Sequence, residues 1–159
     1  WDVDEWHLLY TRRTEAVESH RGQVSFPGGV IESQDNGVEA AALRETYEEI
    51  GIHADDVNIL GRLDTMLTVT QFSITPVVGT IPWPYDLRIN NNEVAHTFGV
   101  PISWLADPAN LEFSERELPV SGQKVPVYFY HPYQGEVIWG ATARITLNFL
   151  QILGMRPGK

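Results

Sequence analysis

The chain has 159 residues, 43% of them hydrophobic and 20% charged, and a formal net charge of −10. This length accommodates one domain over 1–159 with a sizeable core. The acidic balance argues against a general nucleic-acid binder, which needs a basic face to neutralise phosphates. Cysteine is absent, which excludes disulfides and cysteine-ligated zinc. No apolar run could span a bilayer, so we expect no membrane partner. The absence of cysteine is compatible with a reducing cytoplasm, which is the location we expect.

A glycine-rich turn interrupts the N-terminal part of the chain. Three segments before it are predicted to be a strand, a polar loop and a short extended piece, in that order: Trp6–Thr11, Arg12–Arg21 and Gln23–Phe26. Pro27, Gly28 and Gly29 then force a turn, and the two glycines expose backbone carbonyl and amide groups to a ligand. A Pro-Gly-Gly sequence is also common in ordinary turns, so this motif alone does not define a site.

After the turn, the strongest helix prediction covers Asn36–Ile50. Asn36 is expected to cap this helix with Glu39 as its capping-box partner, and Gly51 supplies the stop. The later segments are predicted, in chain order, to be three β segments, a loop, a short apolar piece, a strand and an amphipathic helix: Val57–Leu63, Thr65–Thr70, Ser73–Val78, Pro82–Asn92, Val94–Leu105, Lys124–Tyr130 and Ala141–Gly154. This order predicts an α+β fold in which a mixed β-sheet is covered on two faces.

The predicted helix has two opposite faces. When each residue turns by about 100°, an apolar stripe marks the expected core face: Ala40, Leu43, Tyr47 and Ile50. Glu45, Glu48 and Glu49 fall together on the other side, where each close pair of like charges costs ~0.2–0.5 kcal/mol. A bound cation removes this repulsion, and oxygen ligands suit Mg²⁺ or Mn²⁺. The alternative is a solvated acidic face in which Arg44 pairs with Glu48.

Turn and helix together resemble the Nudix box, whose pattern is G-x5-E-x7-R-E-U-x-E-E-x-G-U with U an aliphatic residue. The chain has Gly29, then Asp35 in the first acidic place. It then keeps every fixed position of the second half except Thr46, in the run Arg44-Glu45-Thr46-Tyr47-Glu48-Glu49-Ile50-Gly51-Ile52. A match of this length is far more specific than a lone glycine motif. The resemblance implies a Nudix-type α/β/α sandwich and hydrolysis of a diphosphate linkage.

The first half of the chain's box departs from the general pattern in two ways, and in both it resembles one branch of the family, the coenzyme A pyrophosphatases. Asp35 replaces the usual glutamate, and the spacer to Arg44 is one residue longer than the general pattern. That branch also carries an upstream signature, whose spacing this chain keeps over Leu9–Gly29. Glu18 stands where the signature has arginine, which inverts a charge suited to phosphate recognition. The resemblance implies cleavage of coenzyme A or acyl-coenzyme A into 3′,5′-ADP and a phosphopantetheine.

The resemblance also assigns roles to single residues. Metal ligands for Mg²⁺ or Mn²⁺ are expected at four positions, the first through its carbonyl: Gly29, Glu45, Glu48 and Glu49. The residues expected to be catalytic are Arg44, Glu48, Glu49 and Glu93. Arg44 is expected to orient a glutamate, and either Glu49 or Glu93 to act as the base that activates water. A solvated loop glutamate is the alternative for Glu93.

A basic cluster lies close to the glycine turn in this otherwise acidic chain, at Arg12, Arg13, His20 and Arg21. Such a cluster indicates a loop that faces substrate phosphates. The residues predicted to bind substrate are therefore Arg12, Arg13, His20 and Gly28, with hydrogen bonding inside the loop as the alternative for His20. Three aromatic residues are candidates either for stacking on a base or for the core: Phe98, Tyr128 and Trp139.

Three functions stay open from the sequence. The first is hydrolysis of coenzyme A, and the second, motivated by Glu18, is hydrolysis of another compound such as NADH, ADP-ribose or a nucleotide sugar. The third is a ligand-binding regulator that has lost catalysis, against which the complete carboxylate set argues. All three imply a small nucleotide-type partner and no nucleic acid, and a homodimer is left open beside a monomer.

Overall fold

The computed structural model describes residues 5–16, 20–68, 71–117, 122 and 124–155. Along the chain its elements are β1 (His7–Arg13), β2 (Val24–Ser25), α1 (Val38–Ile50), the 3₁₀-helix η1 (Ala54–Asp56), β3 (Asn58–Arg62), β4 (Met66–Leu67), β5 (Ser73–Ile74), β6 (Val77–Thr80), β7 (Val94–Pro101), α2 (Ile102–Ala106), the 3₁₀-helix η2 (Pro108–Asn110), β8 (Leu111–Glu117), β9 (Lys124–Tyr130) and α3 (Gly140–Ile152). No helix among these described residues is long and apolar enough to cross a membrane.

The order of elements confirms the α+β fold, and β9 has the predicted bounds. The segment Val94–Leu105, for which only a short apolar piece was predicted, begins with strand β7. Strand β8 was not predicted either, because its side chains are mostly exposed and charged and give no apolar alternation. It nevertheless pairs with β9 from Leu111↔Tyr130 to Glu117↔Lys124. The predicted β segment Thr65–Thr70 is reduced to β4, and residues 69 and 70 lie outside the described part of the chain, as do residues 17–19 of the predicted polar loop.

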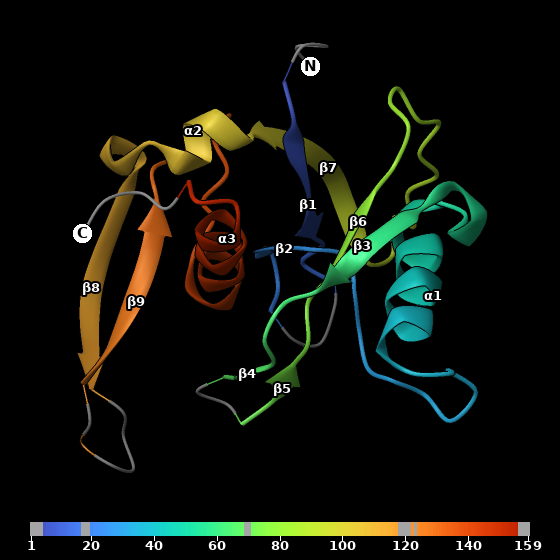
Figure 1. Cartoon of the computed structure of the whole chain (residues 1–159), viewed down its shortest axis with the longest axis horizontal. Helices are drawn as coiled ribbons and strands as arrows, with labels where there is room; N and C mark the ends of the chain where they lie inside the picture. The colour runs from blue at the N-terminus through green and yellow to red at the C-terminus, as the bar shows by residue number, and fades with distance from the viewer. Residues whose placement is uncertain (1–4, 17–19, 69–70, 118–121, 123, 156–159) are drawn as a thin grey trace.

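Strand β1 lies in the middle of a three-stranded sheet with the order β2-β1-β7, and three two-stranded sheets accompany it. Both neighbours of β1 run opposite to it, and every pairing between described strands is antiparallel. The expected mixed sheet is therefore not found among these strands. In Figure 1 α1 lies on one side of the central strands and α3 on the other, as in a sandwich.

Successive side chains of β1 pack alternately into two separate hydrophobic cores. Tyr10 belongs to the core on the α3 side, where its hydroxyl is 2.8 Å from Oγ1 of Thr146. Leu9 packs in the other core, with Ile50 and Ile52 at the end of α1. This alternation is the period-two pattern of a strand with both faces covered. The helices are thereby held against opposite faces of the same strand.

A β-bulge changes this alternation near the end of β1. Arg12 pairs with His96 but Arg13 pairs with Val94, so that Ala95 has no partner across the ladder. The extra residue turns Val94 to the α1 side, where it packs against Ile50 and Ile52. The bulge therefore fixes how β7 meets the end of α1.

Helix α1 differs from its prediction at its start. It begins at Val38, after Gly37 as N-cap, and no side chain caps it. The predicted cap by Asn36 and Glu39 is wrong, because Glu39 instead pairs with Arg62 of β3. The predicted end is confirmed, since Gly51 takes a left-handed conformation and its N–H donates to the carbonyl of Tyr47.

The predicted core face of α1 is only partly correct. Ile50 is buried, but Tyr47 is 51% exposed. Ala40, Leu43 and Tyr47 line an open hollow on the surface next to His53. The helix instead buries Ala41 and Glu49 against the rest of the protein. A helical wheel predicts that the apolar stripe faces the core. In the structure α1 is rotated away from that orientation, because the carboxylate of Glu49 is buried instead.

Replacing Gly51 by alanine should destabilise the protein by about 1–3 kcal/mol. The residue has φ +75°, and a Cβ there would lie 2.7 Å from Cβ of Arg88. Chemical denaturation of the purified variant measures the change. Gly154→Ala is the matched control, because Gly154 has φ +70° at the end of α3 and an added Cβ meets nothing within 4 Å. An equal loss in both variants would show that the Arg88 contact has no effect.

Candidate active site

The glycine turn and helix α1 meet at two glutamates. A Cβ on Gly29 would collide with the carboxylate of Glu45, so only glycine allows this close approach. The backbone N–H of Gly28 donates to Oε2 of Glu49 at 3.3 Å. Positions i and i+4 of a helix lie on one face. The turn therefore lies over the face of α1 that carries Glu45 and Glu49, as the sequence predicted.

Arg44 holds the segment between turn and helix in place. Its Nε and Nη2 donate to the two carboxylate oxygens of Asp35, each at 3.0 Å, and Nη2 also donates to the carbonyl of Val30. Its Nη1 donates to Glu45 at 2.9 Å and to Glu48 at 3.1 Å. A guanidinium presents its donors in a rigid fork that suits such paired contacts. Arg44 thus contacts two of the glutamates, and its role in orienting one of them during catalysis stays a prediction.

Glu49 is the buried carboxylate of the site, with 2% of its surface exposed. Its charged partner is Arg13 of β1, with 3.6 Å between Nη1 and Oε1. The pKa of Glu49 is raised to about 7, chiefly by burial. Arg13 and the N–H of Gly28 oppose the rise, and the negative charges of Glu93 and Glu45 contribute to it. A carboxylate with such a pKa in a group of acidic residues is typical of a functional site.

Glu93 is brought to Glu49 by the loop before β7. The N–H groups of Arg88 and Asn90 donate to the carbonyls of Ile50 and Glu49, both at 2.9 Å. These bonds satisfy carbonyls at the C-terminal end of α1, which have no partner inside the helix. Glu93 lies three residues further on, half-buried, and its carboxylate is near enough to act on the pKa of Glu49. The alternative of a freely solvated glutamate is therefore not what the structure shows.

The end of β1 holds the other side of this loop. The N–H of Thr14 donates to the carbonyl of Glu93 at 2.9 Å, and the Thr14 hydroxyl donates to the carbonyl of Asn92 at 2.9 Å. Sequence reasoning did not assign a role to Thr14 or to Asn90. The sequence does contain features that could have indicated these residues. Thr14 lies within the upstream signature over Leu9–Gly29, and Asn90 is the first of three consecutive asparagines.

The predicted basic cluster is divided between two faces of the sheet. Arg13 points to Glu49, whereas Arg12 donates to Glu136 at 2.8 Å on the other face. His96, the strand partner of Arg12, also lies 3.1 Å from Glu136. Adjacent residues of a strand point to opposite faces. The prediction treated residues 12–21 as a loop and therefore did not separate Arg12 from Arg13.

His20 is exposed, and its Nδ1 is 3.0 Å from Oε1 of Gln23, as in the hydrogen-bonded alternative. Glu18 lies outside the described residues.

The three candidate aromatic residues take part in packing. Phe98 is buried in the core on the α3 side, and Tyr128 packs against that core. Trp139 stacks on Phe129, with ring centroids 6.0 Å apart and planes at 3°. Their positions favour the core alternative over stacking on a base.

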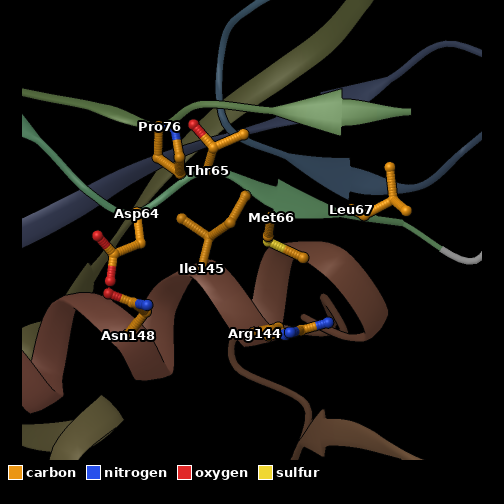
Figure 2. Close-up of a pocket in the computed structure, with 8 residues that line it drawn as sticks. All are labelled: Asp64, Thr65, Met66, Leu67, Pro76, Arg144, Ile145 and Asn148. Carbon is orange, nitrogen blue, oxygen red and sulfur yellow. The ribbon is translucent and has the colours of Figure 1, made fainter. Parts of the chain in front are cut away.

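A groove of about 370 Å³ lies elsewhere, between β4 and α3 (Figure 2). Its lining residues are Asp64, Thr65, Met66, Leu67, Pro76, Arg144, Ile145 and Asn148. None of them was predicted for the site. The candidate active site is instead the exposed surface formed by the glycine turn, α1 and the loop before β7.

The donor set of this surface suits a hard divalent cation. It consists of oxygen atoms only, from Glu45, Glu48, Glu49, the neighbouring Glu93 and the exposed backbone of Gly29. Within the described ranges, no three acidic or histidine side chains are close enough together to form a cation site. In the structure Arg44 contacts Glu45 and Glu48, and Arg13 pairs with Glu49.

The glycine turn and the Arg-Glu helix of this site are the two parts of the sequence that resemble the Nudix box. Residues 2–121 match the family model for the NUDIX domain. The chain is 43% identical over 147 residues to a protein of Photorhabdus laumondii described as an uncharacterized Nudix hydrolase, NudL, with 91% of this chain and 75% of that protein covered. A protein of the same description in Enterobacter sp. is 36% identical over 150 residues, which cover 94% and 77% of the two chains.

A solved structure shares the fold. It is described as a binary complex of a C. elegans Ap4A hydrolase, and it superposes with a TM-score of 0.51 at 17% identity over 60% of this chain and 69% of that chain. The family model and the two relatives show that the chain belongs to the Nudix family. The protein is accordingly a pyrophosphohydrolase that acts on a small nucleotide-type substrate, and enzymes of this family generally need a divalent metal ion.

Replacing Asp35 by asparagine should lower the free energy of unfolding at neutral pH. The hydrogen bonds from Arg44, and then the one from the N–H of Glu32, hold the pKa of Asp35 below its ordinary value of 3.8. A lowered pKa in the folded state stabilises the protein above that ordinary value, and the contribution disappears as the pH falls through the folded-state pKa. The deficit of the variant against the wild type should therefore shrink below pH 3.8.

Urea denaturation at a series of pH values measures this deficit. Asp86→Asn is the matched control, because Asp86 is exposed and no contact of its side chain is described. A deficit for Asp35→Asn that stayed constant from neutral pH down to strongly acidic pH would rule out the Arg44–Asp35 ion pair as its origin.

Proposed function

We propose that the protein hydrolyses coenzyme A or its acyl derivatives to 3′,5′-ADP and a phosphopantetheine. The observation that carries this proposal is the upstream signature, kept in spacing over Leu9–Gly29. In the structure this segment supplies Arg13, Thr14 and Gly28, and each of them contacts the carboxylate group or its loop. A signature that distinguishes the coenzyme A branch is thus part of the site itself.

The proposed division of labour follows the contacts. Glu45, Glu48, Glu49 and the Gly29 carbonyl would hold Mg²⁺ or Mn²⁺, which when bound neutralises diphosphate oxygens and lowers the pKa of a water molecule. Arg44 keeps Glu45 and Glu48 on one side of the helix. Gly28 and Arg13 lie beside Glu49, where a backbone N–H and a guanidinium suit a phosphate oxygen. Arg12 and His20 stay predictions as substrate-binding residues.

The base that activates water is proposed to be Glu93, with Glu49 as the second candidate. Glu49 is buried and already has Arg13 and the N–H of Gly28 as partners. Glu93 is half-buried on a loop at the edge of the site, where water can reach it. A cytoplasmic location, one domain over 1–159 and a homodimer remain predictions.

Hydrolysis of another dinucleotide or nucleoside diphosphate derivative, such as NADH, ADP-ribose or a nucleotide sugar, is the alternative. The observation that favours it is Glu18, together with the engagement of Arg12 by Glu136. Both reduce the positive charge available for the 3′-phosphate that distinguishes coenzyme A from such compounds.

Incubation with coenzyme A and Mg²⁺ should yield 3′,5′-ADP and 4′-phosphopantetheine, and the value of kcat/KM should exceed those for NADH and ADP-ribose. Chromatography of the products measures this directly. Glu48→Gln should lower kcat by about 10²–10³-fold, because one charged group of the site is lost. Glu39→Gln on the same helix is the control, since it removes only the surface pair with Arg62. Unchanged activity and metal binding in Glu48→Gln would contradict the metal site.

Gly29→Ala should weaken Mg²⁺ binding by about 10–100-fold through a displaced ligand. Gly29 is exposed and has no left-handed φ, so alanine fits its backbone, but the added Cβ must push the Glu45 carboxylate away. Stability should change by less than about 1 kcal/mol, because only the end of a flexible side chain moves. Isothermal titration calorimetry and urea denaturation measure the two effects. Val30→Ala, at the exposed neighbouring residue, is the control, and equal Mg²⁺ affinity in both variants would contradict this role of Glu45.

A further inference from the structure

We propose that Asn90 is a positioning residue that holds the carboxylate of Glu93 beside the end of α1. The amide Nδ2 of Asn90 donates to Oε1 of Glu93 at 3.0 Å. This inference deepens the proposed function, since it assumes that Glu93 acts on the water that attacks phosphorus. Asn90 itself does not touch the reacting atoms in this assignment.

Asn90 is the residue through which the loop is attached to the helix. Its N–H donates to the carbonyl of Glu49 at 2.9 Å, and its carbonyl accepts from the N–H groups of Glu93 and Val94. The backbone of Asn90 thereby joins two parts of the site, the helix that bears Glu49 and the turn that bears Glu93. A side chain at position 90 is fixed relative to both glutamates.

The orientation of the Asn90 amide follows from a second contact. Its Oδ1 accepts a hydrogen bond from the N–H of Asn92 at 3.2 Å. Because the oxygen is committed to a backbone donor, the NH₂ group must face Glu93, where it can only donate. The two ends of this amide therefore have separable tasks: the oxygen stabilises the turn, and the nitrogen holds the carboxylate.

Glu93 requires such a donor because of its surroundings. Its charge and that of Glu49 repel each other, as the effect of Glu93 on the pKa of Glu49 shows. A glutamate side chain has several rotatable bonds, and repulsion would favour rotamers that point away from the site. A donor fixed to the helix end counteracts this repulsion and restricts the carboxylate to one place.

The two tasks can be separated by substitution. Asn90→Asp keeps an oxygen for the N–H of Asn92 but replaces the donor by a negative oxygen facing Glu93. Asn90→Ala removes both tasks. Asn91→Ala is the matched control, because Asn91 is an exposed asparagine in the same loop. Thermal denaturation shows whether each variant is folded.

For the substrate that the wild type hydrolyses best, Asn90→Asp should lower kcat by about 10–100-fold with KM nearly unchanged, an effect typical of residues that orient a catalytic group. Asn91→Ala should keep wild-type kcat. In a Glu93→Ala background, Asn90→Asp should lower kcat no further, because its effect passes through Glu93. Wild-type kcat in Asn90→Asp, or a full additional loss in the Glu93→Ala background, would overturn the proposal.

NMR of the Glu93 side chain tests the same inference without turnover. Three-bond couplings should report one χ1 rotamer in the wild type and in Asn91→Ala, and averaging between rotamers in Asn90→Asp. An unchanged single rotamer in Asn90→Asp would overturn the role of Asn90. If no diphosphate compound were hydrolysed by the wild type, the proposed function would fail, while these couplings would still decide whether Asn90 positions Glu93.

Discussion

The burial of one carboxylate organises the site. Glu49 is removed from solvent where β1, the glycine turn and α1 meet, and an isolated charge in such a place is costly. Arg13 from the strand and the N–H of Gly28 from the turn compensate that cost. Three elements that are far apart in sequence are thus tied to a single side chain. The same burial gives α1 its orientation, with Tyr47 exposed although it belongs to the apolar stripe.

A second charge centre, Arg44, contacts the remaining glutamates of the acidic face of α1. Arg44 contacts Asp35, Glu45 and Glu48 and also a backbone carbonyl. The repulsion among these carboxylates favours rotamers that point in different directions. Arg44 holds Glu45 and Glu48 along one side of α1. Its contacts with Asp35 and the Val30 carbonyl attach the segment 30–35 to the helix. Glu48 is therefore the exposed glutamate of the site, Glu45 and Glu93 are half-buried, and Glu49 is buried.

The sequence predicts the local part of this arrangement well. The spacing of Glu45, Glu48 and Glu49, the turn before them and the stop at Gly51 follow from helix geometry and from the box, and all are found in the structure. The burial of Glu49 is not predictable in this way, because the three glutamates are alike on a helical wheel and only contacts with β1 distinguish them. The attachment of Asn90 is hidden for the same reason, since its N–H binds the carbonyl of Glu49, which lies about 40 residues earlier in the chain.

The sheet determines which of two adjacent arginines of β1, Arg12 or Arg13, contacts the site. Arg12 and Arg13 are equivalent in composition and charge, but they project from opposite faces of β1, toward Glu136 and Glu49. The bulge opposite this pair keeps His96 on the face of Arg12 and moves Val94 to the face of Arg13. A shift of one residue in the pairing of β1 with β7 would exchange the faces on which the paired side chains lie. The register therefore determines which arginine accompanies Glu49 as well as how the strands pack. The packing of Val94 against Ile50 and Ile52 resists such a shift, so the hydrophobic core below α1 also fixes the arginine that accompanies the buried glutamate.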